Sequence, residues 1–158
     1  MKESTIEILK KAGWYPNRKI DVIELIELYE KKGFEIFPKA KAFLEEYGML
    51  NVYLPRRIRP GVSDEYDEAH KFKLYTTNMT SYLNGQLSRE TISEYEEDYV
   101  EEKLVVVGSL EGEQYLMISE SGMLFADYGF FGNNAEEFWD KILNYDRLTQ
   151  WIHWDGYI

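Results

Sequence analysis

The sequence predicts an α+β fold, with a mixed or antiparallel sheet that ends in a C-terminal meander and is flanked by helices. Apolar residues at helical spacing dominate the first 48 residues, and three short β-rich runs separated by glycine turns follow at residues 104–127. An amphipathic helical pattern returns after residue 134. No internal repeat or low-complexity linker divides the chain, so we expect one domain over residues 1–158.

Three helices are expected before residue 49. Two of them start at capping-box spacings, the third starts at a proline, and a glycine follows the apolar stripe of each. The expected boundaries are Ser4 with Glu7 and a stop at Gly13, Asp21 with Glu24 and a stop at Gly33, and Pro38 with a stop at Gly48. Residues 13–17, GWYPN, connect the first two helices, and we expect Trp14 and Tyr15 to pack over the junction. A phosphate-binding loop is disfavoured there, because one glycine and a proline offer few backbone donors.

Five strands and two more helices are expected after residue 50. The strands are predicted at 51–54, 72–75, 104–107, 115–119 and 123–127, with a polar connector at 56–70 and a loop, YGFFGNN, at 128–134. The helices are predicted from Ser88, with Ile92, Tyr95 and Tyr99 on one face, and from the capping box of Asn134 and Glu137, with Phe138, Ile142 and Tyr145 facing the core. Consecutive valines at 105–107 indicate a strand covered on both faces. Residues 76–88 are ambiguous between helix and loop.

The excess of acidic over basic residues limits the classes of molecule that this protein can bind. Asp and Glu number 29 and Lys and Arg number 18, which gives a net charge of −11. Such a surface repels nucleic acid backbones and anionic lipids, so we expect neither a nucleic acid nor a membrane as partner. It attracts a basic protein, although acidity can also serve solubility alone. We expect a monomer or a weak dimer.

The absence of cysteine excludes disulfides, thiolate nucleophiles and cysteine metal sites. The N-terminal stretch MKESTIEILKKAG carries acidic residues inside its apolar periodicity, unlike a signal peptide, and no run reaches the length of a membrane span. We therefore expect a cytoplasmic location. No sequence motif indicates a metal or a cofactor, and we expect neither to be bound.

The two histidines are the candidate catalytic side chains. His70 lies near Asp64 and Asp67, and His153 lies among aromatic residues with Asp155 close by. A carboxylate could orient either imidazole for acid–base catalysis. Neither histidine accompanies a G-x-S-x-G, H-E-x-x-H or P-loop motif, so a small hydrolase is the least favoured interpretation.

The densest charge run is SEYEEDYVEEK, at residues 93–103. It places six carboxylates in nine residues: Glu94, Glu96, Glu97, Asp98, Glu101 and Glu102. On a regular helix the side chains at 94, 97, 98 and 101 share a face opposite Tyr95 and Tyr99, and like charges at that spacing destabilise the helix. Two interpretations stay open: a solvated helix face, or a surface on which a basic protein docks.

Two further segments are candidates for a binding surface. The cluster DEYDE, 64–68, lacks the glycine and terminal glutamate of a calcium-binding EF-hand loop. The aromatic C-terminal tail, 148–158, either docks on the domain or offers an aromatic patch to a partner. Their candidate contact residues are Asp64, Asp67, Glu68, Trp151 and Trp154.

The order of the motifs resembles one known family. GWYPNRKID, an amphipathic helix and then GFEIFPKAKAFLEEYGML are similar to the opening of SUKH-superfamily immunity proteins, most closely the third SUKH group. The matching positions are Gly13, Trp14, Pro16, Arg18, Phe34, Phe37, Pro38, Phe43, Leu44, Tyr47, Gly48 and Leu50. The stretch VVVGSLEGEQYLMISESGMLFADYG resembles the strand region of the same family, whereas residues 55–90 match no part of its pattern.

The resemblance implies a role as the cytoplasmic antidote of a polymorphic toxin, often a nuclease. Members of the family bind the toxin and block its active site, and the matched positions have the character of turns, caps and core aromatics. Given that role, the carboxylates at 94–102 are the first candidate for the toxin contact, the 64–68 cluster is the second, and the two tail tryptophans are candidate apolar anchors. The alternatives are a non-catalytic scaffold that binds cellular proteins and an orphan antidote against toxins of other strains.

Overall fold

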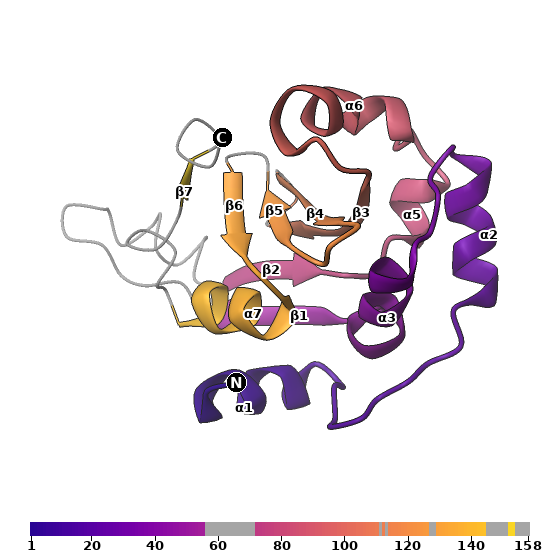
Figure 1. Ribbon diagram of the computed structural model, residues 1–158. Coiled ribbons are helices and arrows are strands. Elements are labelled where there is room, and N and C mark those ends of the chain that lie inside the picture. The colour runs from indigo at the N-terminus through magenta and orange to yellow at the C-terminus, as the bar shows by residue number, and fades with distance from the viewer. Residues whose placement is uncertain (56–71, 111, 113, 127–128, 145–151, 154–158) are drawn as a thin grey trace, which may run out of the picture.

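An antiparallel sheet forms the centre of the computed structural model (Figure 1), which describes residues 1–55, 72–110, 112, 114–126, 129–144 and 152–153. The strands lie in chain order, and each pairs with its neighbour in antiparallel fashion. They are β1 Asn51–Pro55, β2 Phe72–Thr76, β3 Leu104–Leu110, β4 Gln114–Ser119, β5 Leu124–Ala126, β6 Gly129–Gly132 and the two-residue β7 Ile152–His153. The predicted sheet with its C-terminal meander is confirmed.

Helices pack around this sheet, as predicted. They are α1 Glu3–Lys11, α2 Ile23–Lys31, α3 Pro38–Tyr47, α5 Thr80–Leu83, the 3₁₀ helix η1 Arg89–Ile92, α6 Ser93–Tyr95, the π-helical turn η2 Glu96–Val100 and α7 Ala135–Leu143. In Figure 1, α1 lies beside β1 at one end of the molecule and α6 lies at the opposite end. The predicted stops at Gly13 and Gly33 are confirmed, since both have the positive φ, 107° and 88°, that favours glycine after a helix.

The two halves of the sheet are covered differently. Every residue of β3 is buried, and the valines at 105–107 are 0% exposed, as predicted for a strand covered on both faces. In β1 and β2 the burial alternates instead: Val52 and Tyr75 are buried, while their neighbours Tyr53 and Leu74 are exposed. Neighbouring side chains of a strand point to opposite faces of the sheet. The structure therefore covers both faces at β3 but only one face at β1 and β2.

The GWYPN connector between α1 and α2 is a packed corner. Trp14 is buried, stacks on Tyr47 with ring centroids 6.3 Å apart, and donates from Nε1 to Glu46 Oε2 at 3.2 Å. Arg18 donates from Nη1 to the Glu46 carbonyl at 2.6 Å, and burial lowers the pKa of its guanidinium. Tyr15 is 54% exposed, so the expectation that it packs over the junction is wrong. Trp14 packs into this corner and Tyr15 does not, because consecutive side chains outside a helix leave the backbone in different directions.

Two predicted helix starts differ from the structure. The N-cap of α1 is Lys2, and the Ser4 hydroxyl donates to Asn144 Oδ1 at 2.6 Å instead of capping the helix. α2 begins one residue later than predicted, and Asp21 Oδ1 accepts from the N–H of Ile23 at 3.0 Å. A tertiary hydrogen bond and a tighter local turn therefore replace the two capping boxes that the spacing indicated.

Three other segments were misassigned or left open. Residues 129–132, predicted as a loop, form β6. The glycines at both ends have a low strand propensity, so the sequence did not indicate a strand here. The ambiguous region contains α5, a single helical turn. The backbone at 152–153 pairs with β6 as β7, and the other residues of the predicted tail, 148–151 and 154–158, lie outside the described residues. The predicted connector at 56–70 lies outside the described residues.

The N-terminus of α7 carries a pH-dependent ion pair. Asn134 Oδ1 accepts from the N–H of Glu137 at 2.9 Å, as predicted, and Glu137 Oε1 accepts from Lys141 Nζ at 2.9 Å. The hydrogen bond from Lys141 lowers the pKa of Glu137. A folded-state pKa below the unfolded value of about 4.3 stabilises the fold above that pH, and the contribution is lost as the pH falls through the folded pKa.

We therefore predict that Glu137→Gln lowers the free energy of unfolding by no more than about 1 kcal/mol at pH 7, because the ion pair is partly solvated. The difference from the wild type should shrink as the pH falls below about 4. Urea denaturation at neutral and acidic pH measures both values. Glu136→Gln, at an exposed neighbouring position, is the control. A difference that does not change with pH would contradict an electrostatic origin.

Candidate functional site

The acidic segment at 93–102 does not form the regular helix that its spacing predicts. It follows η1 and consists of the single turn α6 and the π-helical turn η2. The π-helical turn ends at Glu101, whose backbone is left-handed with a φ of 59°. Each change in hydrogen-bond register rotates the following side chains relative to a regular α-helix. The carboxylates consequently do not all point as the helical spacing predicts.

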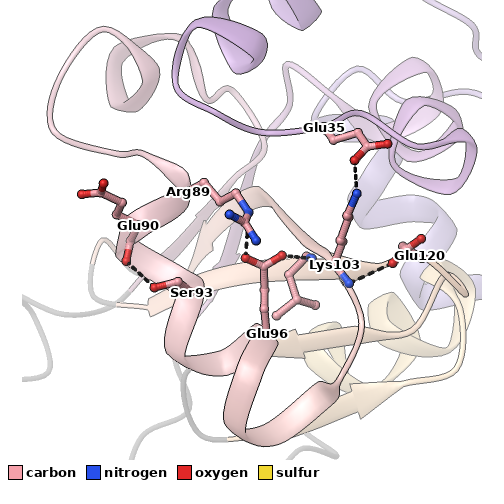
Figure 2. Close-up of polar contacts among 8 residues, drawn as sticks. Glu35, Arg89, Glu90, Ser93, Glu96, Lys103 and Glu120 are labelled. Atoms are coloured by element: carbon pink, nitrogen blue, oxygen red, sulfur yellow. Dashed lines mark hydrogen bonds and ion pairs between the residues drawn. The ribbon is translucent and has the colours of Figure 1, made fainter.

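Glu96, one of the six predicted contact residues in this segment, is buried. Its side chain is 5% exposed and turns inward (Figure 2). Oε2 accepts from the N–H of Leu104 at 3.0 Å, and Oε1 lies 3.2 Å from Nε of Arg89. Glu96 thereby joins the beginning of the segment to the beginning of β3. The carboxylate predicted to contact a partner therefore faces the interior, where it is paired within the molecule.

Glu102 also forms hydrogen bonds within the molecule. Its Oε1 accepts from the N–H of Ser121 at 2.9 Å, and its Oε2 accepts from the Ser121 hydroxyl at 3.1 Å. These bonds join the end of the acidic segment to the turn between β4 and β5. Two of the six carboxylates therefore hold the segment in place at its two ends.

The other four carboxylates of the segment are exposed. They are Glu94, Glu97, Asp98 and Glu101. Tyr95 and Tyr99 are partly buried against the core with ring centroids 6.1 Å apart, which agrees with the predicted separation of aromatic and acidic sides. In the part of the chain that the structure describes, no side chain forms an ion pair with any of these four carboxylates. Their negative charge is consequently available to a partner.

Basic side chains close to the segment are paired inside the molecule. The ammonium group of Lys103 forms an ion pair with Glu35, and this interaction raises the pKa of Lys103. The backbone N–H of Lys103 donates to Glu120 Oε1 at 3.0 Å (Figure 2). Arg89 pairs with Glu96. A hollow of about 250 Å³ lies here, lined by Gly33, Glu35, Arg89, Glu96, Lys103 and Leu104. Its lining carries as many cations as anions, so it adds no net charge to the acidic surface.

Several predicted site residues lie outside the described residues. They are Asp64, Asp67, Glu68, His70, Trp151 and Trp154. For His153 the structure describes the backbone, as part of β7. Within the described ranges, no three His, Asp or Glu side chains gather in a way that could hold a metal ion, and no helix is long and apolar enough to cross a membrane.

Arg89 is the residue that sequence reasoning missed. The buried stripe of this region is Ile92, Glu96 and Val100, spaced at i, i+4 and i+8. Because a glutamate stands in the middle of that stripe, the apolar residues alone predicted that a different face of the helix is buried. The available signal was an arginine seven positions before the glutamate, close to the predicted N-cap Ser88, which the structure confirms. A buried carboxylate requires such a partner.

Comparison with known proteins gives one match. A family model described as SUKH-3 immunity protein matches residues 1–145. No curated protein and no solved structure matches the chain.

Proposed function

Because this chain belongs to the SUKH-3 immunity protein family, we propose that it neutralises a cognate polymorphic toxin by covering the active site of the toxin with an acidic surface. The contact surface consists of the four exposed carboxylates, Glu94, Glu97, Asp98 and Glu101. Family membership supports the role as an antidote. The four carboxylates without an ion pair among the described residues support this mode of binding.

We further propose that the toxin is a nuclease. An enzyme that cleaves nucleic acid binds phosphates with lysine and arginine side chains, and most of its affinity for the substrate comes from these contacts. A dense row of carboxylates on a rigid segment competes for the same cations. The internal hydrogen bonds of Glu96 and Glu102 hold that segment in one arrangement, so little conformational entropy is lost on binding. Inhibition then needs no catalysis by the antidote.

Reversing the four charges tests the proposed contact. We predict that Glu94→Lys, Glu97→Lys, Asp98→Lys and Glu101→Lys together weaken binding of the toxin about 10- to 100-fold, mainly through slower association at low salt. The probe is an inactivated form of a polymorphic toxin against which the wild-type protein rescues growth. Association and dissociation rates are measured at low and moderate salt, together with rescue of growth in cells that express the active toxin.

A matched control separates a local contact from the effect of net charge. Glu3, Glu7, Glu24 and Glu27 are exposed on or beside α1 and α2, and changing all four to lysine alters the net charge by the same amount. This control should keep most of the affinity. Equal losses in both variants would show that net charge alone steers the toxin. A toxin that degrades neither DNA nor RNA would contradict the nuclease part of the proposal.

A further inference from the structure

One part of the sheet exposes apolar side chains that the acidic contact does not use. Tyr53 of β1 lies directly opposite Leu74 of β2, and the two side chains are 61% and 38% exposed. The alternate residues Val52, Leu54 and Tyr75 are buried on the other face. An antiparallel sheet with one solvated face normally places polar side chains outward. Tyr53 and Leu74, which lie opposite each other on adjacent strands, both place a large apolar or aromatic side chain where a polar one is expected.

This pair belongs to a wider uncharged face. Asn51 lies opposite Thr76, the next pair on the same side, and Ser109 of β3 lies opposite Thr76. Ser109 in turn pairs with Tyr115 of β4. Tyr82 of α5 donates from its hydroxyl to Ser109 Oγ at 3.2 Å and contacts the Tyr115 ring edge to face. Among the described residues, α5 therefore lies over this face at β3 and β4, whereas Tyr53 of β1 and Leu74 of β2 stay exposed.

The chemistry of the open face indicates its occupant. The outward residues of β1 and β2 whose side chains the structure describes, namely Asn51, Tyr53, Leu74 and Thr76, carry no charge in a chain in which 30% of the residues are charged. The centres of protein interfaces are depleted in charged residues and enriched in tyrosine. A second copy of this chain would bring two net charges of −11 together, whereas a basic protein is attracted by the same charge. A basic protein with an apolar patch fits this face best.

We propose that the outer face of β1 and β2, with Tyr53 and Leu74 at its centre, is a second docking surface for the cognate toxin. The inference rests on the proposed function, because it assigns this surface to the same partner. The exposed carboxylates accelerate the approach of the basic toxin, and the apolar pair slows its dissociation once it is bound. Electrostatic contacts act mainly on association, and buried aromatic contacts act mainly on dissociation.

The double variant Tyr53→Ser and Leu74→Thr tests this surface. Both positions are exposed, so the variant should keep its fold, which circular dichroism and thermal unfolding check. The probe is the same inactivated toxin as in the charge-reversal test, measured at low and moderate salt. The complex should dissociate at least about tenfold faster, with an unchanged association rate and the same effect at both salt concentrations. Ile23→Ser, which removes a 65% exposed apolar side chain from α2, is the control and should bind like the wild type.

The outcomes distinguish this inference from the proposed function. A wild-type dissociation rate in the double variant overturns the docking surface and leaves the antidote role intact. If the wild-type protein does not bind the toxin, the proposed function fails, and the inference fails with it. If sedimentation shows a wild-type dimer that becomes a monomer in the double variant, the face binds a second copy, and the proposal is overturned. A loss of binding in Ile23→Ser equal to that of the double variant also contradicts it.

Discussion

Replacing Trp139 with alanine is expected to lower the free energy of unfolding by about 3–5 kcal/mol. Trp139 is 0% exposed on the inner side of α7, with its ring 5.8 Å from that of Tyr47 and 4.9 Å from that of Phe138. The truncation removes these contacts and leaves a cavity, because the packed helices and strands around Trp139 hold the neighbouring side chains in place. Guanidinium denaturation at neutral pH measures the loss.

The matched variant Trp139→Phe should cost less than about 1.5 kcal/mol. Among the described residues, the indole Nε1 of Trp139 has no hydrogen-bond partner although it is buried. Phenylalanine keeps an aromatic ring in place and removes this unsatisfied donor, which offsets part of the lost volume. Equal destabilisation by phenylalanine and alanine would show that the indole nitrogen has a partner that stabilises the fold.

The second large effect is expected at the ion pair behind the acidic segment. Arg89→Ala should lower the free energy of unfolding by about 3 kcal/mol, near the lower end for a broken buried pair. The carboxylate of Glu96 is 5% exposed and would lose its only cationic partner among the described residues. The cost stays near the lower end because Arg89 itself is 48% exposed.

Two further variants isolate the buried charge as the cause. Adding Glu96→Gln to Arg89→Ala should restore part of the stability, because the neutral amide oxygen still accepts from the N–H of Leu104. Lys103→Ala breaks the exposed pair with Glu35, whose side chains are 51% and 68% exposed, and should lower the stability far less than Arg89→Ala does. Chemical denaturation of all three variants gives the comparison. An Arg89→Ala variant as stable as Lys103→Ala would contradict this account.

Much of the fold could be predicted because its signals are local. The glycines after α1 and α2, the proline that opens α3 and the asparagine cap of α7 each act within one helical turn. The valines at 105–107 likewise indicate burial on both faces of β3 from three residues alone. The misassigned elements depend on distant partners. β6 forms from a glycine-flanked pair of phenylalanines because β5 and β7 lie on either side of it.

The candidate site was predictable only in part, for the same reason. Helical spacing correctly separated Glu94, Glu97, Asp98 and Glu101 as exposed residues. The spacing placed Glu96 on a different face from these four, but it did not show that Glu96 is buried, because the burial of that carboxylate depends on Arg89 and on the first N–H of β3. Glu96 lies four residues after the buried Ile92 and four before the buried Val100, and a pattern of apolar residues alone does not indicate a buried acidic side chain between them. A run of acidic residues therefore predicts an acidic surface, but it does not predict which of its side chains are exposed on that surface.

The pairing of β7 with β6 has a consequence for the behaviour of the protein at high concentration. β7 comes from residues 152–153, beyond the 1–145 range matched by the family model. Without it, the outer edge of β6 would present unpaired backbone N–H and C=O groups beside Phe130, a template on which strands of other molecules can add. We therefore expect these two residues, which lie beyond the range that the family model matches, to lower the tendency of the described sheet to aggregate at that edge.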